Sequence, residues 1–138
     1  MKINDSEINS SKNIAFLYSG QGAQYFGMCK SFYDTNLVFK NTFDNCNELL
    51  LPFLDLPIKE IIFGENNDNN LINQTQYTQP ALFVIEYSLT KMWQSWGIAP
   101  YALAGHSVGE FVALTISGAI ELKDALNLKE FSFKGIKS

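Results

Sequence analysis

The sequence contains no arginine, since all ten basic residues are lysines, and its one histidine is His106. The lysines form no block and the net charge is −4, so the basic footprint of a protein that binds nucleic acid or anionic membranes is missing. The lack of arginine also removes the side chain that pairs bidentately with a carboxylate. We therefore expect no nucleic-acid or membrane partner.

Cysteines and long apolar runs are equally scarce. Cys29 and Cys46 lie in no CxxC pattern, which argues against paired metal or redox chemistry and favours two buried free thiols. No apolar run approaches the about 18 residues that a membrane-spanning helix needs, and residues 1–13 are polar rather than signal-like. These absences predict no metal site and a cytoplasmic location.

What the sequence does contain is enough apolar material for one domain. Its 138 residues are 46% hydrophobic and 14% aromatic, which suits a globular chain with a substantial core. Residues 1–12 are expected to be a polar, disordered leader and residues 13–138 the folded part. The Asn-rich stretch 65–73 has no apolar periodicity and is expected to be a solvated loop.

Two short apolar runs, residues 14–20 (IAFLYSG) and 101–105 (YALAG), are typical of buried parallel strands and both end in glycine. The clearest helix is predicted to begin at residues 78–80, with Pro80 in its first turn, and to end before Gly97. Further helices are predicted over residues 28–33, 37–50, 57–64, 108–117 and 121–128. This order predicts an α/β sandwich with parallel strands, whose two glycine-rich turns meet at one sheet edge.

The second of these turns has the pattern of a nucleophile. Residues 105–109 (GHSVG) fit G-x-S-x-G, in which small flanking residues let a strand and a helix approach closely and hold the serine on a strained turn. Ser107 is therefore a candidate catalytic nucleophile, and the N–H of Val108 would donate to the oxyanion formed by its attack. A tight turn with an incidental serine is the alternative.

The first turn, residues 19–24 (SGQGAQ), offers a second donor. Glycines on both sides of Gln21 expose the backbone and let it approach a ligand. Together with the elbow, this turn predicts a two-donor oxyanion hole formed by the N–H groups of Gln21 and Val108.

Three stretches, FLYSGQGAQYFGM, TQPALFVIEYSLTKMWQSWGIAP and GHSVGEFVAL, resemble the acyltransferase domain of polyketide and fatty acid synthases, the malonyl-CoA:acyl carrier protein transacylase family. The similarity runs from Ile14 to Leu128, with the motifs in the family's order and spacing. It implies a partial α/β-hydrolase-like sandwich with a nucleophile elbow, the amino-terminal half of a catalytic domain whose ferredoxin-like subdomain is missing.

The resemblance implies transfer of an acyl group, of malonyl type, from acyl-CoA through an acyl-Ser107 intermediate. The acceptor would be the phosphopantetheine thiol of an acyl carrier protein, and no cofactor would be bound. Gln21 and Val108 match the family's oxyanion-hole positions. Gln79 matches a glutamine beside the acyl pocket; a helix-start residue that bonds the backbone is the alternative interpretation.

The sequence departs from the family at two functional positions. The family's general base is a histidine far downstream of the elbow, whereas no histidine follows Ser107 here. His106 is expected to point back into the sheet and to support the substrate site, which leaves the source of the base open. The family's carboxylate-binding arginine is replaced by Ser132, and Lys134 would fill the role only after a shift of register.

Two other functions compete with the acyltransferase. A non-catalytic remnant or interaction module of a synthase would use the same fold for docking, and the apolar surface left by a missing half predicts a partner or a complementing chain. An α/β-hydrolase esterase is the least favoured, because its triad needs a histidine after the serine.

Overall fold

The computed structural model describes residues 13–65 and 69–127, so the expected leader, Ser132, Lys134 and the end of the last predicted helix lie outside the described residues. In chain order the elements are β1 (Ala15–Tyr18), α2 (Lys30–Thr35), α3 (Leu37–Leu50), the 3₁₀ helix η1 (Leu51–Phe53), α4 (Ile58–Phe63), α5 (Asn69–Ile72), α6 (Thr75–Ser95), β2 (Ala102–Gly105), α7 (Val108–Ser117) and α8 (Leu122–Asn127).

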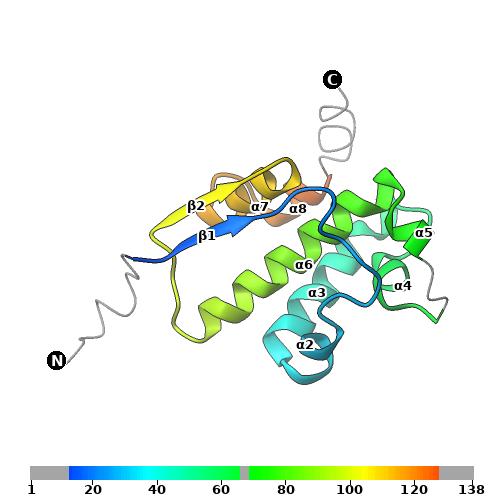
Figure 1. The fold of residues 1–138 in the computed structure, drawn as a ribbon, viewed down its shortest axis with the longest axis horizontal. Coiled ribbons are helices and arrows are strands. Elements are labelled where there is room, and N and C mark those ends of the chain that lie inside the picture. Colours follow the sequence, from blue (N-terminus) through cyan, green and yellow to red (C-terminus); the bar gives the residue numbers. More distant parts are fainter. Residues whose placement is uncertain (1–12, 66–68, 128–138) are drawn as a thin grey trace.

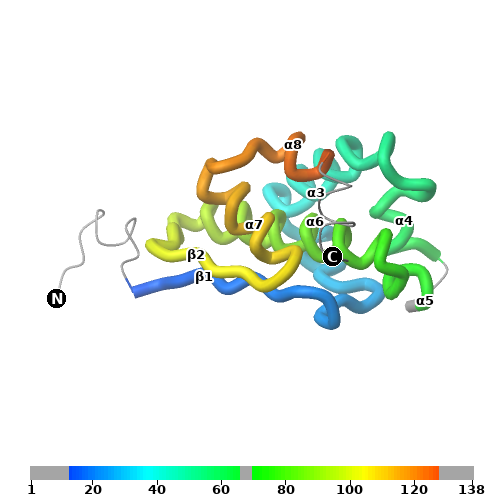
Figure 2. Tube along the Cα trace, turned by 90° about the horizontal axis from the view of Figure 1, so that it is seen from above, coloured from blue at the N-terminus to red at the C-terminus, as the bar shows by residue number. Residues whose placement is uncertain are grey.

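The two strands pair in parallel, with Tyr18 opposite Gly105, so that both end at the same edge of the sheet. Figures 1 and 2 show the strands together on one side of the molecule, with α7 and α6 next to them. α7 contacts both strands and α6, and α6 in turn contacts α3. The predicted parallel α/β arrangement is confirmed.

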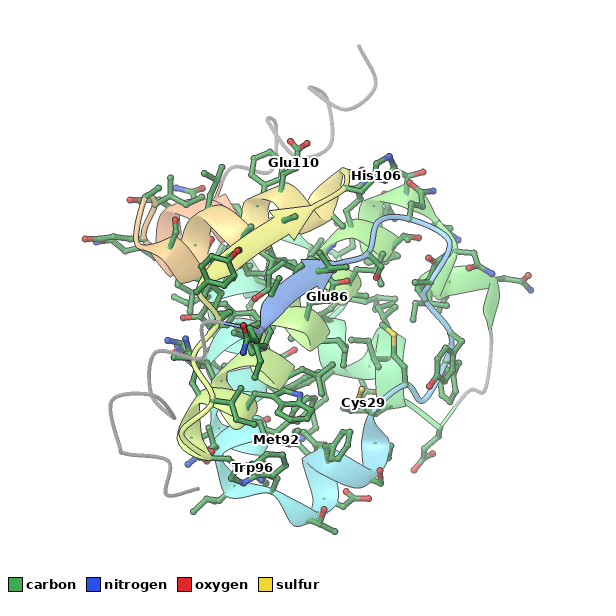
Figure 3. All side chains as sticks on the ribbon, turned by 60° about the vertical axis from the view of Figure 1, so that its left-hand side comes forward. Cys29, Glu86, Met92, Trp96, His106 and Glu110 are labelled. Atoms are coloured by element: carbon green, nitrogen blue, oxygen red, sulfur yellow. The ribbon has the colours of Figure 1, made fainter. Side chains whose placement is uncertain are left out.

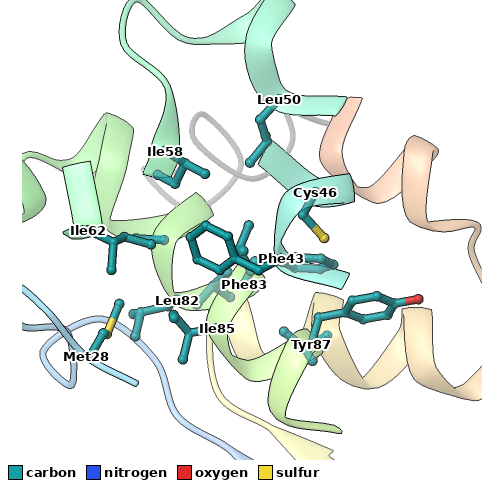
Figure 4. Close-up of a cluster of buried hydrophobic side chains, with 14 of the residues drawn as sticks. Met28, Phe43, Cys46, Leu50, Ile58, Ile62, Leu82, Phe83, Ile85 and Tyr87 are labelled. Carbon is teal, nitrogen blue, oxygen red and sulfur yellow. The ribbon is translucent and has the colours of Figure 1, made fainter. Parts of the chain in front are cut away.

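The core lies between α3, α4 and α6, where Phe43 of α3 stacks on Phe63 of α4 at 5.0 Å between ring centroids. Figure 4 shows this cluster, whose labelled members are Met28, Phe43, Cys46, Leu50, Ile58, Ile62, Leu82, Phe83, Ile85 and Tyr87. α3 occupies the residues predicted for it. Its start is fixed by Asn36, whose side chain accepts a hydrogen bond from the N–H of Phe39 at 2.9 Å.

α6 begins at Thr75 rather than at residues 78–80, so the predicted start is wrong and Pro80 lies inside the helix. Pro80 has no N–H to donate to the preceding turn. That turn is held instead by the buried Thr78, whose hydroxyl lies 2.5 Å from the carbonyl oxygen of Ile72 and 3.0 Å from that of Gln74. Burial of Tyr77 and Thr78 in the first turn, which no periodicity reveals, carries the helix across the proline.

The predicted loop over residues 65–73 is also partly wrong, because α5 occupies Asn69–Ile72. Ile72 is fully buried and α5 contacts α6, so one apolar residue anchors a helix too short to show periodicity. Of the two free thiols, Cys46 is buried as predicted and Cys29 is only half-buried. None of the described helices, α6 included, is long and apolar enough to cross a membrane.

Candidate active site

Ser107 lies in the turn between β2 and α7 with φ 59° and ψ −122°. A non-glycine residue in such a conformation costs roughly 1–3 kcal/mol and persists only when its surroundings impose it. Its side chain makes no capping hydrogen bond to α7. The predicted strained turn is therefore present, and the hydroxyl is not used to cap the helix that follows.

Close backbone packing imposes this conformation. A β-carbon on Gly105 would overlap the backbone carbonyl of Gly109, and one on Gly109 would lie 2.5 Å from the carbonyl oxygen of Tyr18. Only glycine fits at both positions, so β2, α7 and β1 meet backbone to backbone around Ser107. The glycines of the GHSVG pattern are thus required for the reason expected from the sequence, which is that they let the strand and the helix approach closely.

The first glycine-rich turn packs against this elbow. A β-carbon on Gly20 would lie 2.8 Å from the carbonyl oxygen of His106 and 3.1 Å from the β-carbon of Ser107. The N–H of His106 donates to the carbonyl oxygen of Tyr18 at 3.2 Å. The prediction that the two turns face each other at one sheet edge is confirmed.

The backbone donors expected for an oxyanion hole flank this contact. Val108 is the first residue of α7, so its N–H has no acceptor within the helix. The next two N–H groups, of Gly109 and Glu110, donate to the carbonyl oxygens of His106 and Ser107 at 3.1 and 3.0 Å. Gln21 directly follows the Gly20 contact, so the structure brings both candidate donors to the neighbourhood of Ser107.

His106 does not occupy the packed position expected for it. β2 ends at Gly105, so His106 belongs to the turn and does not follow the strand's alternation. Its side chain is exposed, and Figure 3 shows it at the end of β2. The ring Nδ1 lies 2.9 Å from the position of a β-carbon on Gly20, which places the imidazole over the first turn.

Gln79 links α6 to the same turn. Its side chain is only 1% exposed, and its Nε2 donates to the Oε1 of Gln21 at 3.3 Å. The Oε1 of Gln79 is buried without a hydrogen-bond partner. Gln79 is the fifth residue of α6 and bonds a side chain, so its interpretation as a helix-start residue is wrong; its place beside an acyl pocket stays a prediction.

Glu86 is a residue of the site that the sequence analysis missed. Its Oε1 accepts hydrogen bonds from the N–H and the hydroxyl of Ser19, at 2.8 and 2.5 Å. Its Oε2 is buried without a partner, and burial raises the pKa of this carboxyl to about 7. The available signal was that Glu86 is the only acidic residue in α6.

A groove of about 380 Å³ runs beside β1 on the side of Glu86. Its walls are mainly apolar side chains of β1 and α6, including Phe16, Leu89 and Trp93. Leu17 is 79% exposed at its rim. Among residues 13–65 and 69–127, no group of His, Cys, Asp and Glu side chains is placed to hold a metal ion.

The sequence model of the acyl transferase domain matches residues 15–132. The chain belongs to the acyl transferase domain family. It is 39% identical over 123 residues to orsellinic acid synthase ArmB of Armillaria ostoyae, covering 87% of this chain and 6% of that synthase.

Two solved structures of the family share the fold. The acyltransferase domain from the second module of the salinomycin polyketide synthase has 35% identity and a TM-score of 0.79, covering 91% of this chain and 28% of that one. A malonyl CoA-acyl carrier protein transacylase from Clostridium perfringens ATCC 13124 has 34% identity and a TM-score of 0.74, covering 86% and 36%. The chain thus spans about a third of the length of these two structures.

Proposed function

We propose that this acyl transferase chain supplies the nucleophile and oxyanion hole for acyl transfer from acyl-CoA to an acyl carrier protein. In the first half-reaction the Oγ of Ser107 forms an ester bond to the acyl carbonyl carbon, the thioester C–S bond breaks, and coenzyme A leaves as a thiol with the hydroxyl proton. In the second, the phosphopantetheine thiol of the carrier attacks this ester. The new C–S bond forms as the ester C–O bond to Ser107 breaks, and the Ser107 oxygen regains a proton from the thiol.

The observation that carries this proposal is the strained Ser107 turn with the Gly20 turn packed against it. The N–H groups of Gln21 and Val108 would be the two backbone donors of the proposed oxyanion hole. Donors fixed in advance stabilise the negative charge that develops on the carbonyl oxygen, and loss of one such donor typically slows a reaction by about 10²–10³.

The acyl group is proposed to be of malonyl type, because the GHSVG form is similar to that of malonyl-accepting family members. Gln79 and His106 would line the acyl site. The sequence has no arginine to pair with the malonyl carboxylate, so preference for malonyl over acetyl is expected to be weak. The general base is proposed to come from a complementing chain or the rest of a synthase.

The test is intact-protein mass after incubation of the full chain with malonyl-CoA or acetyl-CoA, beside Ser107→Ala. We expect the mass of the chain to rise by a single acyl group and this rise to be absent in Ser107→Ala. A parallel incubation with p-nitrophenyl acetate distinguishes this activity from that of a simple esterase. Carrier protein bearing phosphopantetheine, when added, should then take the acyl group from Ser107. The chain would lose the added mass and the carrier protein would gain it. A folded chain that takes no label from either acyl-CoA contradicts the proposal and favours the non-catalytic interaction module.

A further inference from the structure

Three polar side chains of α6 bond the end of β1 and the turn after it. The hydroxyls of Thr90 and Tyr18 lie 2.9 Å apart. Glu86 accepts from Ser19, and Gln79 donates to Gln21. Residues 18, 19 and 21 thus contact residues 90, 86 and 79 of α6, so the turn runs antiparallel to the helix.

These three partners lie on one face of α6. Gln79 and Glu86 are seven positions apart, and Thr90 follows Glu86 by four, spacings that keep side chains on one side of a helix. The intervening residues Pro80, Leu82 and Val84 are buried. α6 therefore holds the turn through a stripe of polar side chains that lie among buried residues.

We propose that Glu86 is the positioning residue of the oxyanion hole: by holding Ser19, it sets where the N–H of Gln21 lies relative to Ser107. This inference rests on the proposed acyl transfer and assigns a new residue to it. Glu86 does not touch the reacting atoms and acts through Ser19.

Among the three contacts, that of Glu86 has the strongest bonding. One carboxyl oxygen accepts two hydrogen bonds from Ser19, from its N–H and from its hydroxyl. The Gln79 contact is longer, at 3.3 Å, and the Thr90 hydroxyl also bonds the carbonyl oxygen of Glu86 in its own helix at 2.8 Å. Ser19 is thus the firmly held point of the turn.

The position of Ser19 directly affects the position of the backbone at the site. Only Gly20 separates Ser19 from Gln21, and Gly20 is in close contact with His106 and Ser107. Gly20 has no side chain of its own to hold the turn, so the fixed Ser19 determines where the next N–H groups point. Displacement of a donor by about 1 Å is enough to slow catalysis severely.

The second oxygen of Glu86 shows that this carboxyl is not optimised for stability. Oε2 is buried with no hydrogen-bond partner, and an unsatisfied buried polar group lowers the stability of a fold by about 1–3 kcal/mol. The same side chain lines the apolar groove beside β1, where an apolar residue would fit. A carboxyl at such a place is expected of a site rather than of a core.

The experiment compares Glu86→Met, Glu86→Gln and a control in the full chain. Methionine has a similar length and fits an apolar wall but cannot accept the Ser19 bonds, whereas glutamine keeps an acceptor oxygen. Ser88→Ala is the matched control, because Ser88 is buried on α6, its hydroxyl has no partner and it does not bond the turn. Glu86→Ala replaces the methionine variant should that variant fail to fold.

Two readouts are measured on each variant: amide hydrogen exchange of residues 19–21, and the rate of Ser107 acylation as a function of acyl-CoA concentration. In Glu86→Met we expect exchange of the Ser19 amide to quicken at least about 10-fold, because its acceptor is gone. We expect the saturating acylation rate to fall about 10-fold, less than the loss of a whole donor, with the half-saturating concentration changed less than 2-fold. Glu86→Gln should restore both.

The outcomes separate this inference from the proposed function. If the unmodified chain is not acylated at all, the proposed transfer fails. Amide hydrogen exchange at residues 19–21 then still tests whether Glu86 holds Ser19. Unchanged exchange in Glu86→Met overturns the inference, as does faster exchange with an undiminished acylation rate. Equal losses in the glutamine and methionine variants also overturn it, because glutamine keeps the acceptor.

Discussion

Gly20 and Ser107, 87 positions apart in the sequence, are in direct contact: a β-carbon on Gly20 would lie 3.1 Å from that of Ser107. The carbonyl oxygen of His106 would be even closer, at 2.8 Å. The two turns therefore approach as near as backbone allows. The candidate active site exists because Gly20 carries no side chain at this contact.

Gly20→Ala is expected to push the turns apart. The new methyl group would lie 2.8 Å from the backbone carbonyl oxygen of His106, which cannot turn away as a side chain can. We therefore expect a loss of about 1–3 kcal/mol of unfolding free energy and slower acylation of Ser107. Denaturant unfolding and the mass assay measure the two effects. Ala23→Ser, at an exposed position in the same loop, is the control, and equal stability of both variants would contradict the tight contact.

Ser107→Gly is expected to stabilise the fold while abolishing acylation. Glycine adopts positive φ without the clash that a side chain causes, so relief of strain should add about 1 kcal/mol to the unfolding free energy. The control is Ser31→Gly, because Ser31 lies in the helix α2 and glycine there should lower stability by about 0.5–1 kcal/mol. A lower melting temperature in Ser107→Gly would mean that Ser107 is not strained.

Imidazole in solution is expected to speed acylation of Ser107. The sequence has one histidine, His106, and a positioned base typically contributes 10²–10⁴ to such a reaction, so a soluble base should give a rise of about 10-fold or more. His106→Ala should respond to imidazole as the unmodified chain does. Acylation that is insensitive to imidazole but lost in His106→Ala would instead identify His106 as the base.

The stability of the protein should depend on the protonation of Glu86. Burial raises its pKa from 4.5 to about 7, so the folded state binds this proton more tightly than the unfolded state. Its contribution to stability is fully present below pH 4.5 and is lost as pH rises through about 7. Glu86→Gln should therefore flatten the pH dependence of the unfolding free energy over this range.

The matched control for that measurement is Glu48→Gln, which removes the same charge from α3. Each variant is unfolded with denaturant at several pH values between 4 and 8. The difference between the Glu86→Gln and Glu48→Gln profiles isolates the buried carboxyl. Identical profiles would show that Glu86 keeps an ordinary pKa.

Local patterns predicted much of this fold. The spacing of apolar residues and the flanking caps placed α3 and α7 at their observed ends, and both strands fell within the predicted runs. GHSVG predicted the strained Ser107 because its glycines are required by contacts within five residues and with the adjacent strand. The prediction failed at α5 and at the start of α6, where one or two buried residues decide the structure.

The sequence by itself determined the candidate nucleophile, the glycines around it and the family, because these depend on short patterns whose chemistry is local. It did not reveal Glu86, the Gln79–Gln21 contact or the exposed position of His106. Only the tertiary structure decided these, because they depend on which face of α6 meets the end of β1 and on where β2 stops. The role of the Glu86 carboxyl becomes evident only when the fold places the N–H of Ser19 opposite it.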